Sequence, residues 1–289
     1  MSEAVVSPLP AGPPASTRRG RPSLLVIGAF VVVGVVTVCA IGGAAVAPHD
    51  PSAQNLLVTL TKPSMSHPFG TDDLGRDIFS RTIAGARTAI IGPLIIALGA
   101  MLIGNFFGLL AGYYGGPVDS TIMRIADFLF ALPALLVAIV VVGVLGGGYY
   151  RAVILLVLLF CPLDARLVRA ATLEQRGRAY VEAARTLGLS RRRIIFHHIW
   201  PNVLPVAIAN ATLAFAYALV SLSALSFLGI GVGPGTADWG RMLSDSRTLL
   251  FENPATALAP GIALVITAAA VNVIGDWLYE RVSDSGRVR

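Results

Sequence analysis

Long apolar runs alternate with shorter polar stretches along this chain, and six of the runs approach the length of a membrane-spanning helix. The first, residues 24–47, contains no charged side chain. As a helix it would extend about 36 Å, enough to cross a bilayer core of about 30 Å. The others lie at about residues 88–112, 128–146, 152–168, 203–227 and 257–274. The pattern therefore predicts an all-α integral membrane protein with six transmembrane helices.

The fourth run is the least regular, because Asp164 and Arg166 follow only 12 uncharged residues. Charged side chains inside a membrane usually face protein or water rather than lipid. We therefore expect this helix to turn both charges toward neighbouring protein or toward the membrane interface. We also expect Pro162 to kink it.

The composition narrows the class of protein further. Of the 289 residues, 55% are hydrophobic and 13% are charged, and the mean hydropathy is +0.74, which excludes an ordinary water-soluble core. The net charge of +6 is then an indication of topology rather than of nucleic-acid binding. With the N-terminus in the cytoplasm, 15 Lys and Arg residues fall inside and 7 outside, so the positive-inside rule favours two cytoplasmic termini.

This topology divides the chain into five consecutive parts. Residues 1–23, rich in proline and arginine, predict a disordered cytoplasmic tail. A first transmembrane helix over 24–47 and an extracytoplasmic segment over 48–87 lead into a core of five spans over 88–280. Residues 281–289 form a second cytoplasmic tail. Within the core, we expect two polar segments, one cytoplasmic and one extracytoplasmic, at residues 171–201 and 231–256.

The cytoplasmic segment indicates two short helices joined by a tight corner. Gly188 is suited to the left-handed conformation that ends a helix, Ser190 is suited to cap the next helix, and Pro201 marks the start of the fifth span. Apolar or small side chains would gather on one side of each helix, namely Ala183, Ala184 and Leu187, and Ile194, Ile195, His198 and Ile199. These faces suit a docking partner, but a solvated loop whose arginines set topology and touch lipid phosphate explains the residues equally well.

A resemblance to a known family distinguishes between these alternatives. Glu182-Ala183-Ala184, followed after three residues by Gly188 and after twelve more by Pro201, resembles the EAA loop of ABC-importer membrane subunits. The resemblance to one branch of that family covers nearly the whole chain from about residue 24. It rests on HPFGTDDLGRDIFSRTIAGAR (67–87), AGYYGGPVDSTIMRIADFLFALP (111–133), LSFLGIGVGPGTADWGRML (225–243) and NVIGDWL (272–278). These stretches are similar to the C-type permease of dipeptide and oligopeptide ABC importers.

The resemblance implies a type I ABC-importer permease, a multi-pass subunit of a bacterial cytoplasmic membrane. Its partners would be a sister B-type permease, two ATP-binding cassette subunits, an extracytoplasmic peptide-binding protein and membrane lipid, with no nucleic acid. The substrate would be a dipeptide or an oligopeptide, and members of this branch also move nickel or glutathione. The loop would couple the permease to the ATPases through Glu182, Ala183, Ala184, Leu187, Gly188, Arg192, Ile195, His198 and Pro201.

The sequence offers no residues for ATP hydrolysis or for a metal centre. A phosphate-binding loop needs a glycine-rich turn before a lysine, and no such turn precedes Lys62, the only lysine. We therefore expect no cofactor and no enzymatic activity in this chain, with ATP and Mg²⁺ bound by the partner ATPases. His49 and His67 outside, and His197 and His198 inside, are not expected to form metal sites.

Polar side chains within the apolar runs are candidates to line the pathway or to bridge helices: Asn105, Asn210 and Asn272. We expect Asp127 and Asp276 near cytoplasmic ends, paired with Arg124 and Arg281 at helical spacing. The alternative function is a proton-coupled secondary carrier that uses the two aspartates as a relay and needs no ATPase.

The extracytoplasmic segments contain candidate contacts to a binding protein: Asp72, Asp73, Arg76, Asp77, Trp239 and Arg241. Residues 70–77 lack the acidic final ligand of an EF-hand loop, so we expect a packed elbow here rather than a Ca²⁺ site. Trp239, Arg241 and Arg247 fit an interfacial membrane anchor equally well.

Overall fold

Helices make up most of the part that the computed structural model describes, which is residues 22–287, the last six as backbone only. The long helices are α1 (Leu24–Gly42), α2 (Ile78–Tyr114), α5 (Tyr149–Arg176), α8 (Trp200–Phe227) and α10 (Ala255–Arg287). The shorter ones are α3 (Gly116–Ala131), α4 (Ala134–Val144), α6 (Ala179–Thr186), α7 (Arg191–Arg193) and α9 (Trp239–Asp245). Short turns of 3-10 helix, η1 (Gly43–Ala45), η2 (Leu56–Val58) and η4 (Ser246–Thr248), and one π-helical turn, η3 (Ile194–Ile199), complete the elements. The predicted all-α class is confirmed.

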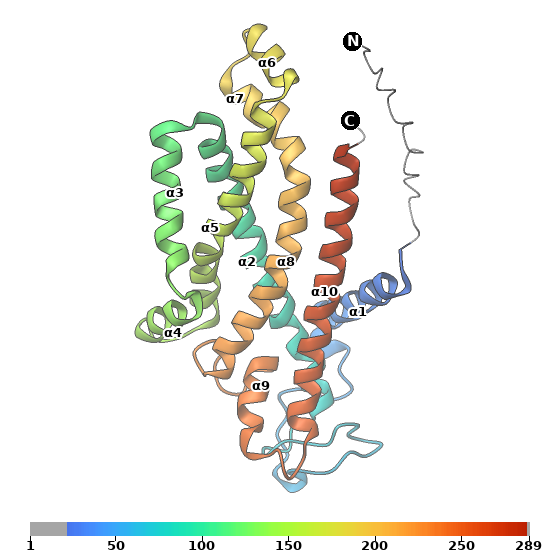
Figure 1. Ribbon diagram of the computed structural model, residues 1–289. Coiled ribbons are helices and arrows are strands. Elements are labelled where there is room, and N and C mark those ends of the chain that lie inside the picture. Colours follow the sequence, from blue (N-terminus) through green and yellow to red (C-terminus); the bar gives the residue numbers. More distant parts are fainter. Residues whose placement is uncertain (1–21, 288–289) are drawn as a thin grey trace, which may run out of the picture.

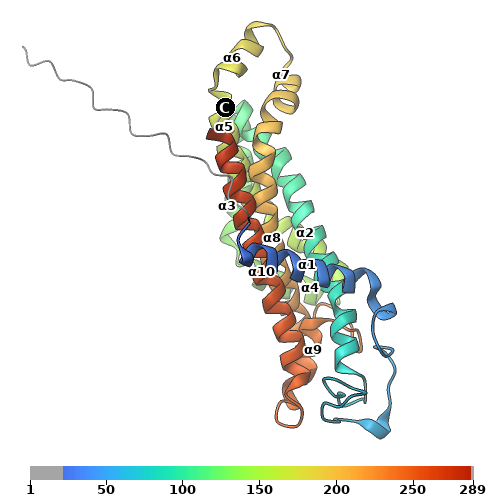
Figure 2. The ribbon, with the colours of Figure 1, turned by 90° about the vertical axis from the view of Figure 1, so that its right-hand side faces the viewer.

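The long helices form an elongated bundle with a distinct structure at each end. Figure 1 shows α2, α5, α8 and α10 running lengthwise, with α6 and α7 beyond one end and α9 at the other. Figure 2 shows α1 lying across the bundle, where it packs against α2 and α10. The C-terminal end of α10 lies toward the end that carries α6 and α7 (Figure 1).

Four stretches among the described residues are long and apolar enough to span a membrane, and a fifth counts if a bent pair is taken as one span. The four are Leu24–Ala45, Ile78–Tyr114, Arg191–Phe227 and Ala255–Arg281, and the bent pair is α3 with α4, which meet at 81°. The prediction of a continuous third span over 128–146 is wrong. Leu132 has an extended conformation, with ψ of 130°, because the ring of Pro133 disfavours a helical residue before it.

The second span begins ten residues before its predicted start. Arg81 and Arg87 indicated a loop in the sequence, but both lie within α2. The Asp77 side chain caps this helix by accepting a hydrogen bond from the Ser80 N–H, which satisfies a donor in the first helical turn. The predicted tail over 1–23 lies outside the described residues, apart from its last two.

The charges in the fourth span are held by protein, as expected. Arg166 of α5 donates to Asp127 of α3 over 2.6 Å. Arg169, also of α5, pairs with Asp119 of α3. The predicted partner of Asp127 was therefore wrong: Arg166 from a neighbouring helix takes the place of Arg124. Ion pairs across two helices position α3 beside α5, which a local i,i+3 pair within α3 would not do.

A stripe of glycines allows α2 and α5 to approach closely. Gly104, Gly108 and Gly112 recur every four residues on one face of α2, and each faces α5. A Cβ atom at Gly108 would lie 2.6 Å from the Ala165 carbonyl oxygen and 2.8 Å from Cβ of Val168. Small residues at such spacing let helix backbones pack tightly within a membrane, so this contact forms the centre of the bundle.

Candidate functional site

The corner at Gly188 has the geometry that its sequence predicts. Gly188 has a φ of +72°. The Leu189 N–H donates to the Ala184 carbonyl over 3.2 Å, and the Gly188 N–H donates to the Arg185 carbonyl over 3.0 Å. These two hydrogen bonds define a Schellman ending of α6, and Ser190 then caps α7. We refer to residues 179–199 as the α6–η3 segment.

The apolar side of the second short helix faces inward. Ile194, Ile195 and Ile199 are buried in a cluster to which α2, α5, α6 and α8 also contribute. The prediction that Ile195 belongs to a docking face is therefore wrong, because the chain itself covers that face. Burying an isoleucine side chain is worth about 1.5–3 kcal/mol, which favours packing against the bundle over exposure.

The first short helix divides its predicted face in the same way. Val181 and Ala184, three residues apart, point into the apolar cluster. Ala183 is on the exposed side with Glu182, and the side chain of Leu187 is 79% exposed. The surface left for a partner therefore consists of the tip around Gly188 and the outer side of α6.

An open hollow of about 420 Å³ adjoins this tip, lined by Ser190, Arg192, Arg193, Phe196 and His197. Two neighbouring cations are directed elsewhere. Arg185 lies over the Tyr113 ring at 5.5 Å, and Arg191 over the Tyr114 ring at 5.9 Å, both at the end of α2. Such cation–π contacts direct the two side chains onto the bundle. Arg192, which the sequence predicts to be a contact residue, is exposed at the tip.

A π-helical turn connects the tip to the membrane helix. His198, a predicted coupling residue, is partly buried in this turn, η3, and its carbonyl accepts a hydrogen bond from the Asn202 side chain. Pro201 stands in the first turn of α8, as predicted. Turns of π-helix are rare and occur frequently at functional sites. Residues 191–227 form one helical run, so the tip is joined to α8 without a break in the helix.

The asparagines within the spans lie in three different environments. Asn210 of α8 donates to Asp164 of α5 over 2.6 Å, so it bridges two helices. Asn105 is buried on α2, and its Oδ1 lacks a hydrogen-bond partner among the described residues. Asn272 is exposed on α10. The sequence identified Asp164 as a charge that protein must cover but did not reveal its partner, because the two residues are 46 positions apart.

At the opposite end of the bundle, residues 48–77 fold into a packed elbow. Arg76 donates to Asp72 over 2.7 Å, and Arg81, which is 2% exposed, lies 3.7 Å from the same carboxylate. Arg81 also donates to the carbonyl oxygens of Pro51 and Gly235. A buried charge is tolerated only when it is paired and hydrogen-bonded, so this network fixes the elbow to α2 and to the loop before α9.

This burial corrects the predicted surface for a binding protein. Of its six residues, Asp72, Arg76, Asp77 and Trp239 are buried, Arg241 is paired with Asp245, and only Asp73 is exposed. Trp239 does not anchor the chain in a membrane interface either. Its indole N–H donates to the Thr82 carbonyl over 2.8 Å, and its ring packs against Gly85. The indole satisfies its donor inside the protein, as buried tryptophans usually do.

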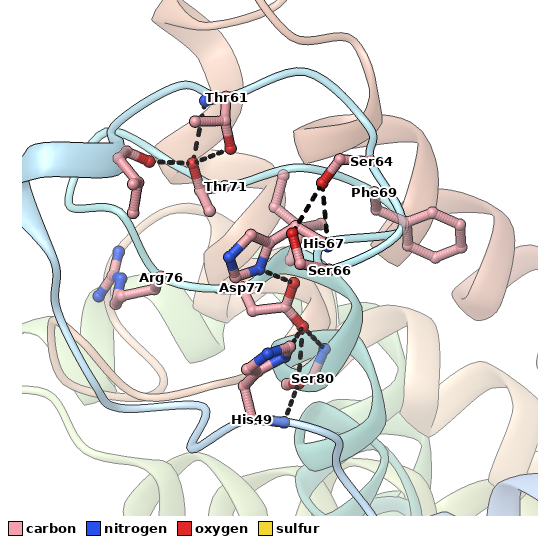
Figure 3. Close-up of polar contacts among 12 residues, drawn as sticks. His49, Thr61, Ser64, Ser66, His67, Phe69, Thr71, Arg76, Asp77 and Ser80 are labelled. Carbon is pink, nitrogen blue, oxygen red and sulfur yellow. Dashed lines mark hydrogen bonds and ion pairs between the residues drawn. The ribbon is translucent and has the colours of Figure 1, made fainter.

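The elbow also brings His49 and His67 together, although they lie 18 residues apart in the sequence. Figure 3 shows both rings beside the carboxylate of Asp77. His67 Nδ1 lies 3.0 Å from Asp77 Oδ1, and His49 Nδ1 lies 3.7 Å from Oδ2. Burial alone would raise the pKa of Asp77, but hydrogen bonds from Ser80 and His67 and the charge of His49 outweigh it, so this pKa lies below its ordinary value.

Known proteins resemble this chain over most of its length. The family model for a binding-protein-dependent transport system inner membrane component matches residues 104–287. A dipeptide transport system permease protein, DppC, of Alkalihalophilus pseudofirmus is 38% identical over 257 residues, which cover 89% of this chain and 83% of the relative. A glutathione transport system permease protein, GsiD, of Pectobacterium atrosepticum is 39% identical over 218 residues, or 75% of this chain and 72% of the relative.

The fold is also found among solved structures. A chain of the methionine ABC transporter MetNI, in an inward-facing conformation, matches with a TM-score of 0.57 and 19% sequence identity. The match covers 70% of this chain and 95% of the other. At this identity the likeness concerns the arrangement of helices.

Proposed function

The chain belongs to the family of binding-protein-dependent transport system inner membrane components, and on this premise we propose that it is a membrane subunit of an ATP-driven peptide importer. It would form half of the translocation pathway, with a sister permease as the other half. Two separate ATP-binding cassette subunits would bind ATP and Mg²⁺ and supply the energy, and an extracytoplasmic binding protein would deliver a dipeptide or an oligopeptide. The names of the relatives, which refer to dipeptides and to glutathione, support a peptide as the substrate class.

The α6–η3 segment carries this proposal. It projects beyond the end of the bundle (Figure 1), its tip exposes Glu182, Gly188 and Arg192, and its inner side is packed into the apolar cluster against α2, α5 and α8. A segment that is exposed at its tip and rigidly packed at its base suits the transfer of movement from a partner to the bundle. We propose that closure of the ATPases displaces this segment and thereby changes the tilt of α8.

The competing proton relay receives less support. Asp127 forms an ion pair with Arg166 of the neighbouring helix, which gives it a structural role in holding α3 beside α5. Asp276 lies on the exposed side of α10. A secondary carrier would require these two aspartates to exchange protons. We propose instead that transport depends on ATP.

Reconstitution tests this function directly. Proteoliposomes with both permeases, both ATPases and the binding protein should take up a labelled dipeptide only when ATP is inside, where the ATPases are. The chain purified alone should neither bind nor hydrolyse ATP, because its sequence offers no phosphate-binding loop. Uptake driven by a proton gradient in the absence of ATP would instead identify a secondary carrier.

We propose the topology that the charge distribution favours: six spans, both termini and the α6–η3 segment in the cytoplasm, and the elbow and α9 outside. In cells that carry a cysteine-free chain, with Cys39 and Cys161 replaced, Ser66→Cys and Thr236→Cys should react with an impermeant thiol reagent. Ser190→Cys should react only after the cells are opened. All three positions are exposed, so reactivity reports the side of the membrane. Labelling of Ser190→Cys in intact cells would reverse the orientation.

A further inference from the structure

The elbow contains a group of side chains that peptide transport does not explain. His49, His67 and Asp77 each offer one ligand atom, and these atoms all lie within 4.8 Å of one another. The residues come from three separate places: the chain after η1, the middle of the elbow, and the position that caps α2. Figure 3 shows their side chains converging. Because the three are 10 to 28 residues apart, their convergence results from the folded elbow and not from a local sequence motif.

The two histidines differ in their relation to the Asp77 carboxylate, because His67 Nδ1 lies within hydrogen-bonding distance of Oδ1, at 3.0 Å. His49 Nδ1 lies 3.7 Å from Asp77 Oδ2, which is too far for a hydrogen bond. A tetrahedral zinc ion with bonds of about 2.0–2.1 Å holds its ligand atoms about 3.3 Å apart. Each imidazole lies near that separation from one oxygen of the Asp77 carboxylate, His67 Nδ1 at 3.0 Å from Oδ1 and His49 Nδ1 at 3.7 Å from Oδ2. Small rotations of the two rings would therefore admit the ion.

A second layer of contacts already orients the ligands. Asp77 Oδ2 accepts hydrogen bonds from the Ser80 N–H over 2.8 Å and from the Ser80 hydroxyl over 2.6 Å. The same hydroxyl oxygen accepts a hydrogen bond from the His49 backbone N–H over 3.1 Å. Ser80 thus holds both the carboxylate and the backbone of one histidine, which is how outer partners position metal ligands. Asp77 Oδ1 faces the His67 ring over 3.0 Å, so it can bind an ion that displaces the proton between them.

The exposure and the charge of the group suit an exchangeable cation. The side chains of His49, His67 and Asp77 are 43%, 23% and 2% exposed, so the ion would reach solvent on the histidine side and keep a water molecule as a fourth ligand. The nearby cation Arg76 is engaged by Asp72. Two imidazole nitrogens and one carboxylate oxygen suit zinc, whereas Ca²⁺ and Mg²⁺ require oxygen ligands.

We propose that His49, His67 and Asp77 form a zinc-binding site that fastens the elbow to the start of α2. The ion joins the chain that leaves α1, the middle of the elbow and the cap of α2 at one point. It would therefore stabilise the elbow without taking part in transport. This inference replaces the expectation that His49 and His67 form no metal site, and it does not depend on the proposed substrate.

The test is metal binding by the full chain in complex with its sister permease, purified in detergent with a tag that contains no histidine. After treatment with a chelator, the complex is titrated with Zn²⁺ alone in a calorimeter. Binding should saturate at one ion per chain. Co²⁺ in the same site should give the visible absorption of a tetrahedral complex. The apparent melting temperature should rise with Zn²⁺, since an ion that binds only the folded state stabilises it.

Variants separate this site from adventitious binding. His49→Ala and His67→Ala should each weaken Zn²⁺ binding by more than about tenfold, the smallest effect usual even for an outer-shell change. Asp77→Asn should do the same while retaining the α2 cap, because asparagine caps a helix as well as aspartate does. His197→Ala, at the other end of the bundle, is the matched control and should bind normally. The site is disproved if the wild-type complex shows no saturable binding, if Ca²⁺ binds equally well, or if binding survives in all three ligand variants.

Discussion

A Gly188→Val variant should assemble with its partners and reach the membrane, yet lose most peptide uptake and binding-protein-stimulated ATP hydrolysis. Gly188 has a φ of +72°, and an L residue in that region costs about 1–2 kcal/mol. An added Cβ would meet no atom of the described residues within 4 Å, so the cost arises in the backbone alone. If the tip relieves this backbone strain by losing the Schellman ending, the correctly formed corner should become roughly 5- to 30-fold less populated. We expect uptake to fall by about that factor.

Two matched variants show whether backbone conformation is the cause. Gly188→Asn should retain most uptake, because asparagine visits the left-handed region at lower cost than other residues with a side chain. Gly177→Val places the same side chain before α6, where φ is −84° and only an ordinary contact would form, so it should transport normally. The measurements are uptake and ATP hydrolysis in proteoliposomes at equal amounts of assembled complex. Normal uptake by an assembled Gly188→Val complex would remove the proposed coupling role from this corner.

The features that sequence predicts best here are local ones. The second, fourth, fifth and sixth apolar runs lie within helices that the structure contains, and the first overlaps α1 and η1 except for its last two residues, since crossing a membrane imposes a minimum number of apolar residues. Gly188 and Ser190 act where their intrinsic preferences suggest, because helix ends are determined by a few neighbouring residues. The helix break at Leu132 is signalled by Pro133, which disfavours a helical residue before it, but the apolar run continues across both residues and gives no sign of an interruption.

The features that sequence did not predict depend on contacts between distant segments. Ile195 looks like a docking residue until α2, α5 and α8 are placed around it. Asp72 and Arg76 look like solvent-exposed charges because polar composition suggests a loop, yet the folded elbow buries them with Arg81. The two histidines of the elbow, 18 residues apart, come together only in the folded elbow. Burial and pairing across such separations require the tertiary structure.

A Gly108→Val variant should fail at an earlier stage than Gly188→Val, with on the order of tenfold less folded permease recovered from the membrane. A Cβ atom at Gly108 would lie 2.6 Å from the carbonyl oxygen of Ala165, and a backbone oxygen cannot move aside as a flexible side chain can. Overpacking of this kind costs about 1–3 kcal/mol or more. To relieve the overlap, α5 would have to move away from α2. The close contact between the two helices would then be lost.

Gly34→Val is the matched control for this prediction. Gly34 lies within an apolar helix, α1, and a Cβ atom there would meet nothing within 4 Å among the described residues. The substitution changes hydrophobicity and helix propensity as Gly108→Val does, but it creates no overlap. Recovery should be compared by fluorescence-detected size exclusion of detergent extracts, with the sister permease co-expressed. Equal recovery of the two variants would show that the glycine stripe on α2 is not a close-packing site, and α2 and α5 would then have to be further apart than the structure places them.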